Sequence, residues 1–294
     1  IALHWNGSDG NLAVARPSRI IFTDSNGEVR TGSVKPLVSL APTLSISQHG
    51  NFGIAAEAER AAVQVFNPSV AASNDGSVNC DSASQPCRTI FLNELSRDET
   101  EVEEEARVHS IALHHTFASN PLIAYLLLTG DSRIGFMMLS SGLGLREEES
   151  GFLQLLDGDL SPRAMAITKK SVVTVVGHDR AGRAAGAALL VANSADDHAQ
   201  AEPFQLPAES CPVVLDAEFS DSTLLMADDC TGSLWELPLD EEGRPTGAEP
   251  IHHPLGDECK KPFKLASLPA AGDEKALTFV GCEGESHILV HNRN

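Results

Sequence analysis

The chain has few aromatic residues, and its apolar runs are short. Aromatic side chains make up 5% of the 294 residues, with one Tyr and two Trp. Strands are usually richer in them, so Ala and Leu must fill much of the interior. No apolar run approaches the roughly 18 residues of a membrane-spanning helix. The sequence therefore predicts no membrane span.

Basic residues are also scarce. The chain has 21 Lys and Arg against 41 Asp and Glu, which gives a formal charge of −20 at pH 7. So negative a surface repels phosphate backbones, and no basic stripe interrupts it, so we expect no nucleic-acid partner. Cations, or another protein with a basic or mixed surface, fit better. Solubility alone is the simpler explanation of the charge.

Several catalytic signatures are missing as well. The sequence contains no Gly-x-Ser-x-Gly elbow and no phosphate-binding Gly-x-x-x-x-Gly-Lys loop. Hydrolase chemistry of the α/β type and nucleotide chemistry therefore have no motif to support them. We assign no catalytic residue, and the sequence leans away from an enzyme.

The chain does contain a recurring sequence pattern. A short segment that starts a predicted strand, here called an opener, precedes a second apolar run. The starts are 73, 53, 50 and 50 residues apart, from 109−36, 162−109, 212−162 and 262−212. Self-similarity at such a period indicates a repeat architecture. Ile1-Ala2-Leu3-His4 echoes Ile111 to His114, which adds a sixth copy. The other five openers begin at Pro36, His109, Pro162, Pro212 and Pro262.

Two further apolar stretches follow the later openers. Each is short, aliphatic or β-branched, and bounded by turn residues, which is typical of strands. Three to four strands in about 50 residues form one sheet of a repeat protein. The second runs begin at Leu126, Val173, Leu224 and Leu277. The third runs are Ile134 to Leu139, Ala187 to Val191, Leu234 to Leu239 and Ile288 to His291.

The segment from Thr223 to Gly243 resembles a blade of the β-propeller superfamily. It has a turn at Asp228 to Gly232, the strand Ser233 to Leu237 and a second turn at Asp240 to Gly243. Similar patterns occur in gluconolactonase-like, NHL and WD-repeat propellers, although the Gly-His and Trp-Asp signature of WD blades and the double-glycine kelch signature are absent. The resemblance covers most of the chain and selects no single family.

The openers predict an all-β, six-bladed propeller with blades of three to four antiparallel strands, in a single domain of residues 1–294. The interval from Pro36 to His109 is too long by about half a blade. We interpret the excess as an insertion at about residues 67–107. A seven-bladed ring, with a degenerate blade in the insertion, is the alternative.

Six cysteines fall into close pairs along the chain. In the repeat alignment, Cys211 and Cys259 lie just before a first strand, and Cys230 and Cys282 lie just past the second. Those ends are neighbours in an antiparallel pair, so each pair can link the same corner of its blade. Six cysteines allow fifteen connectivities, and the repeat favours one. Its disulfides are Cys80 with Cys87, Cys211 with Cys230, and Cys259 with Cys282.

Paired cysteines at equivalent blade positions indicate an oxidising compartment. We expect a secreted or periplasmic protein, or one on the extracellular surface. A zinc–thiolate site is the competing interpretation, but no Cys-x-x-Cys spacing supports it.

The insertion carries the small Cys80–Cys87 ring, a predicted strand at Thr89 to Leu92 and an acidic run. Long loops in compact domains are often functional. A solvated connector explains the run simply, whereas a partner-binding arm explains why a disulfide stands beside it. The candidate partner-binding residues are Asp98, Glu99, Glu101, Glu103, Glu104 and Glu105.

A second candidate site lies at the mouth of the channel. If the first strand is innermost, its start and the end of the second strand share one face, where loops from several blades converge. Carboxylates there could bind Ca²⁺, and the gluconolactonase-like resemblance implies a divalent metal in the channel. Asp also favours turns for local reasons. The predicted rim residues are Asp131, His178, Asp179, Asp228, Asp229 and Glu283.

Two functional hypotheses result. The first is a surface or secreted interaction module, a rigid disulfide-linked propeller that binds a partner protein through rim loops or the insertion, as a subunit of a complex. The second is a Ca²⁺-dependent lactonase or esterase-like hydrolase acting at the channel mouth. The sequence favours the interaction module, with Ca²⁺ as the one possible cofactor.

Overall fold

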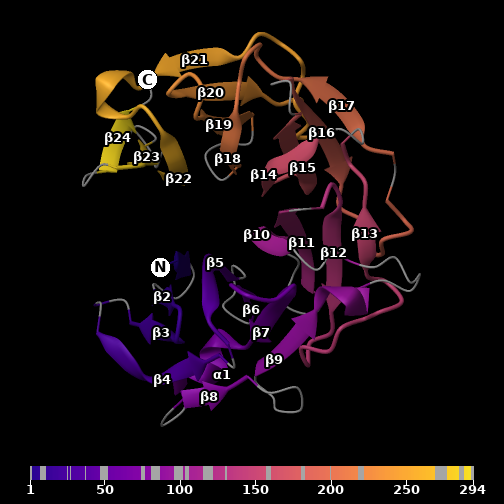
Figure 1. Ribbon diagram of the computed structural model, residues 1–294, viewed down its shortest axis with the longest axis vertical. Helices are drawn as coiled ribbons and strands as arrows, with labels where there is room; N and C mark the ends of the chain where they lie inside the picture. The colour runs from indigo at the N-terminus through magenta and orange to yellow at the C-terminus, as the bar shows by residue number, and fades with distance from the viewer. Residues whose placement is uncertain are drawn as a thin grey trace. The chain divides into compact units, whose positions relative to one another are not determined.

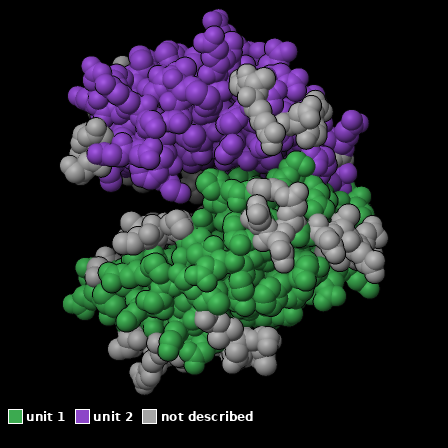
Figure 2. All heavy atoms as spheres, viewed as in Figure 1, with its two compact units in different colours: residues 1–153, 192–197 green, residues 154–191, 198–294 purple. Residues whose placement is uncertain are grey.

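The structure, a computed structural model, divides the chain into two compact units. Unit 1 comprises residues 1–153 and 192–197, and unit 2 comprises residues 154–191 and 198–294 (Figure 2). The structure describes residues 2–6, 11–24, 26, 28–36, 38–46, 52–73, 77–80, 87–95, 102, 106–114, 122–129, 131–156, 160–179, 183–198, 200–217, 222–268, 277–284 and 288–292.

Both units consist of sheets in which neighbouring strands are mostly consecutive in the chain; the exceptions are the pairs β4 with β8 and β7 with β9 (Figure 1). The described residues form six sheets of three to five strands, three in each unit. All pairings are antiparallel except that of β4 with β8. The all-β prediction is confirmed, and six sheets fit six blades.

Unit 1 contains the first three sheets. The first sheet has β1 (Ala2–Asn6), β2 (Asn11–Arg16), β3 (Arg19–Thr23), β4 (Val29–Lys35) and β8 (Ser77–Asn79). The second has β5 (Leu40–Ile46), β6 (Gly53–Glu57), β7 (Ala62–Phe66) and β9 (Cys87–Phe91). The third has β10 (Arg107–His114), β11 (Leu122–Thr129), β12 (Ile134–Leu139) and β13 (Gly151–Leu153).

Unit 2 contains the other three sheets. The fourth has β14 (Ser161–Ile167), β15 (Val172–His178), β16 (Ala184–Leu190) and β17 (Glu202–Gln205). The fifth has β18 (Pro212–Asp216), β19 (Thr223–Asp228), β20 (Ser233–Pro238) and β21 (Ile251–Pro254). The sixth has β22 (Pro262–Leu268), β23 (Leu277–Cys282) and β24 (Ile288–Asn292). A 3₁₀ turn, η2 (Gly256–Glu258), joins the last two sheets.

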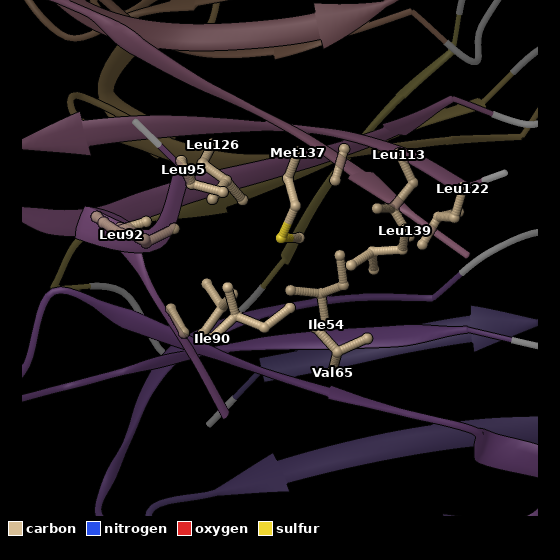
Figure 3. Close-up of a cluster of buried hydrophobic side chains, with 14 of the residues drawn as sticks. Ile54, Val65, Ile90, Leu92, Leu95, Leu113, Leu122, Leu126, Met137 and Leu139 are labelled. Atoms are coloured by element: carbon tan, nitrogen blue, oxygen red, sulfur yellow. The ribbon is translucent and has the colours of Figure 1, made fainter. Parts of the chain in front are cut away.

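Within each unit, the first strands of successive sheets are neighbours. β5 lies next to β1 and β10 in unit 1, and β18 lies next to β14 and β22 in unit 2. The sheets pack face to face through alternate apolar side chains. Figure 3 shows the core between the second and third sheets, where Ile54, Val65 and Ile90 face Leu126 and Met137. All five side chains are buried, which fixes the register of both sheets.

The first strands of the last four sheets share an irregularity near their starts. One extra residue there forms a β-bulge, which tolerates Pro because Pro cannot donate a ladder hydrogen bond. The recurring Pro of the openers therefore belongs to a repeated bulge. The register shifts lie between Val108 and Ser110, Pro162 and Ala164, Pro212 and Val214, and Pro262 and Lys264.

The segment at residues 67–107 contributes regular elements to unit 1. β8 extends the first sheet and β9 completes the second. In the chain, α1 (Pro68–Ser73) lies between β7 and β8, and η1 (Leu92–Leu95) follows β9. Leu92 and Leu95 are fully buried. Whether residues 1–294 form one domain with an insertion stays a prediction.

Three disulfides join all six cysteines. Cys211–Cys230 and Cys259–Cys282 each link the first and second strands within one sheet, with Cα atoms 5.2 and 5.4 Å apart. Cys80–Cys87 instead connects the end of β8 to the start of β9, and thus the first sheet to the second. These are the pairs that the repeat favours.

No helix among the described residues is long and apolar enough to cross a membrane.

Candidate functional site

The rim residues lie at or just after the ends of second strands. Asp131 follows β11, His178 ends β15 and Asp228 ends β19, each beside the start of its first strand. Asp179, Asp229 and Glu283 follow directly. Asp131 belongs to unit 1 and the other five to unit 2. All six residues therefore lie at the end of a sheet where its second strand finishes.

Asp131 is held by one neighbouring arginine. Its carboxylate accepts hydrogen bonds from the backbone N–H and the guanidinium of Arg133, with Nη2 2.6 Å from Oδ2. Burial alone would raise the pKa of Asp131, but the hydrogen bonds and charge of Arg133 outweigh burial and lower it. The guanidinium also lies over the ring of Phe152, 4.7 Å from its centre. The Asp131 carboxylate is therefore ionised, and the Arg133 guanidinium compensates its charge.

Asp179 is hydrogen-bonded to Arg183 through both its backbone and its side chain. Its N–H donates to the carbonyl of Arg183 at 3.0 Å, and its Oδ1 accepts the Arg183 N–H at 2.8 Å. The Arg183 Nε also lies 3.2 Å from Oδ2. Asp24 with Glu28 and Asp240 with Arg244 are joined by the same two hydrogen bonds. A side-chain acceptor at the first position thus stabilises several hairpins.

Asp228 is fully buried and satisfied by its own sheet. Its Oδ1 accepts the backbone N–H groups of Cys211, Cys230 and Thr231, and its Oδ2 accepts the Trp235 Nε1–H at 3.1 Å. Three backbone donors and an indole hold the carboxylate at the Cys211–Cys230 corner. Its position therefore has a structural explanation.

A serine and a histidine lie close to Asp228 but form no catalytic relay with it. His252 stacks on Trp235 with ring centres 4.3 Å apart, and its Nε2 lies 2.7 Å from the Ser233 Oγ. Ser233 is fully buried, and its hydroxyl donates to the Thr231 carbonyl. The carboxylate bonds to the indole, whereas a triad needs it on the imidazole.

The remaining rim residues are more exposed. Glu283 is 70% exposed and lies 3.7 Å from the Lys261 ammonium group. The Asp229 N–H donates to the Cys211 carbonyl, and the His178 Nδ1 lies 3.3 Å from the Asp179 carbonyl oxygen. Within the described ranges, no three His, Cys, Asp or Glu side chains meet in an arrangement that could hold a metal. Metal binding at the rim stays a prediction.

The six acidic residues of the proposed partner-binding arm lie outside the described residues. They are Asp98, Glu99, Glu101, Glu103, Glu104 and Glu105.

The structure also shows a buried polar cluster that the sequence analysis missed. Glu57 is fully buried between the Arg60 guanidinium, with Nε 2.6 Å from Oε2, and the Gln64 amide, with Nε2 3.0 Å from Oε1. Arg60 in turn covers the ring of Phe91. The Glu-x-x-Arg spacing across a hairpin turn was the available signal, but the spacing alone does not show whether the pair is buried.

A second missed cluster joins the fifth and sixth sheets. The His253 Nε2 lies 2.5 Å from the Glu236 Oε1, and the ring of His291 packs edge-on against that of His253. His253 is one member of a His-His pair that the sequence shows, but its partners come from β20 and β24. Such cross-sheet neighbours become visible only once the register is known.

The chain has a β-propeller fold. Its structure resembles the β-propeller domain of Myceliophteria thermophila Cps50 (Swd1), with a TM-score of 0.62 and 10% identity, over 99% of this chain and 82% of that one. Kuenenia stuttgartiensis hydrazine synthase matches with a TM-score of 0.51 and 11% identity, over 99% and 95% of the two chains.

The dihydro-heme d1 dehydrogenase NirN gives a TM-score of 0.53 at 11% identity, over all of this chain and 55% of that chain. No protein-family model matches the sequence, and no curated protein is similar to it. At such identities the likeness extends to the fold alone, since propellers host many unrelated functions.

Proposed function

We propose that this protein is a rigid, disulfide-linked propeller scaffold that binds another protein in an oxidising compartment. The observation that carries the proposal is the placement of the disulfides. Two of them fix the same corner of successive sheets, and the third ties the first sheet to the second. Such cross-links keep loops at defined positions, which lowers the entropy cost of binding.

The charge of the chain suggests the character of the partner. A net charge of −20 favours a basic or mixed protein surface through long-range attraction. The densest acidic run in the sequence, between residues 98 and 105, directly follows the elements that carry the Cys80–Cys87 link. We propose that this run is the arm that meets the partner.

The test neutralises the arm and leaves the fold intact. Deleting residues 74–105 would also remove β9 and the buried Leu92 and Leu95, so substitution is the sharper change. The variant carries Asp98→Asn and Gln at the five glutamates. The control neutralises six exposed carboxylates elsewhere, namely Glu147, Asp196, Asp197, Glu241, Glu242 and Glu249.

Both variants and the wild type are used, in oxidised form, for pull-down from the native compartment. We expect the wild type and the control to retain one stoichiometric partner and the arm variant to lose it. Equal capture by all three proteins would show that the arm is not the binding site. No stoichiometric partner for any of them would count against the scaffold function itself.

A further inference from the structure

The contact between the fifth and sixth sheets changes character along its length. Near the Cys259–Cys282 disulfide it is apolar, with Leu234 and Leu255 packed against Val280. Two residues further along each strand, the same faces carry polar side chains, because alternate residues share a face. The fifth sheet presents Glu236 there, and the sixth presents Thr278 and His291.

A pair of histidines forms the outer part of this contact. His253 lies on β21 opposite Leu234, and His291 lies on β24 opposite Thr278. Their ring centres are 5.0 Å apart, with the planes at 63°. The His253 Nε2 lies 2.5 Å from the Glu236 Oε1. The ring contact joins the last strands of the two sheets. Both histidines are partly buried, so water reaches their rings only in part.

We propose that His253 and His291 form an acid-sensitive latch between the fifth and sixth sheets. In neutral form the two rings pack edge to face and hold β24 against β21. Once both are protonated, two positive charges about 5 Å apart repel each other in a partly desolvated site. Acidification therefore loosens β24 from β21. The latch is independent of the proposed partner.

Among the residues that the structure describes, the other groups that face the pair do not cancel this repulsion. Glu236 can neutralise one imidazolium but not two. Asp216 lies in register with Leu225, and Leu225 with Glu236, so it shares the face at greater distance. β22 and β23 present Leu265, Ser267, Thr278 and Val280 to the contact, which carry no charge. His252 points to the opposite face, where it stacks on Trp235.

The direction of the titration agrees with the geometry. Burial lowers the pKa of His253, and burial together with the neighbouring His253 lowers the pKa of His291. The unfolded chain, in which His titrates near about 6.5, then binds more protons than the folded one. The stabilising contribution is complete above that pH and is lost as pH falls through the lowered values.

Two buried hydroxyl groups make opening easier. The Thr278 Oγ1 and the Ser267 Oγ are buried and have no hydrogen-bond partner among the described residues, and they lie opposite each other in the sixth sheet. Buried hydroxyls without partners are unfavourable. Water that enters beside β24 would satisfy them, which lowers the cost of opening the contact.

Hydrogen exchange of the oxidised, full-length chain tests the latch. Between about pH 7.5 and about pH 5, we expect amide protection of residues 288–292 to fall about tenfold after correction for intrinsic rates. The His253→Gln, His291→Gln double variant should show no such difference. His252→Gln, on the same strand but the other face, should behave as the wild type does.

A protection factor in the wild type that does not change with pH would overturn the proposal, as would an equal change in the double variant. NMR titration of the imidazole protons gives a reading that needs no variant. Both histidines should titrate below about 6.5, the value of free histidine. Titration of either one above that value would also overturn the latch.

Discussion

Asp228 shows how one side chain can organise a whole corner of a sheet. Its two oxygens accept three backbone N–H groups and the Trp235 indole N–H. These four donors surround the carboxylate beside the Cys211–Cys230 disulfide. A buried carboxylate is tolerated only with such a set of donors. Asp228 is therefore better explained by stability than by ligand binding.

Replacing Asp228 with Asn should destabilise the protein. The amide keeps one acceptor oxygen but turns a donor toward either the indole or the backbone N–H groups. We expect the free energy of unfolding to fall by about 1–3 kcal/mol, as for a buried group with a broken hydrogen bond. Chemical denaturation of the oxidised protein measures the change.

Asp229→Asn is the matched control, one residue further along and partly exposed. Its unfolding free energy should stay within about 0.5 kcal/mol of the wild type. Equal losses in the two variants would show that the buried hydrogen bonds are not the cause.

At the scale of elements, the sequence predicts the inner strands better than the outer ones. The predicted third strand Ile134 to Leu139 coincides with β12, and its residues are all buried. A buried run leaves a clear apolar signal. β17 and β21 are mostly exposed and were not predicted, because an exposed outer strand has no alternating pattern to recognise.

The short helix α1 was missed although its signals are present. The Asn67 Oδ1 accepts the Val70 N–H at 3.1 Å, and Pro68 occupies the first helical position. An Asn cap followed by Pro is a known helix start. The six residues are too few to show helical periodicity.

For the candidate site, the sequence placed the rim residues at the ends of second strands but could not show the Arg133, Arg183 and Trp235 contacts, which depend on turn geometry.

The disulfides should contribute strongly to the stability of the sheets that they close. Cys211–Cys230 and Cys259–Cys282 span 19 and 23 residues. Loops of that length predict a loss of about 3 kcal/mol when either pair is replaced by Ser. Thermal and chemical unfolding of each double variant measure the loss.

Reduced wild-type protein is the comparison for the two Ser variants. It should be less stable than either variant, because all three disulfides are then open. A loss below about 1 kcal/mol for both variants would mean that the cross-links do not restrain the unfolded chain as expected.

At the scale of the whole molecule, the net charge of −20 attracts cations without creating a specific site. Calorimetry with Ca²⁺ on the chelator-treated, oxidised protein distinguishes diffuse attraction from binding at a specific site. We expect no stoichiometric binding, because Asp131 and Asp179 are in ion pairs with arginine and Asp228 is enclosed by N–H groups. A specific Ca²⁺ site needs six to eight oxygen ligands that are free to coordinate.

NaCl at equal ionic strength is the control, because diffuse attraction is screened by any salt, whereas a coordinated ion is not displaced by Na⁺. One-site binding that persists in NaCl and disappears in Asp179→Asn would contradict the expectation and establish a metal at the rim. The hydrolase hypothesis would then become the one to pursue, with lactone and ester panels assayed with and without Ca²⁺. Weak heats that vanish in salt would leave the acidic surface as a property of the scaffold, available to a basic partner.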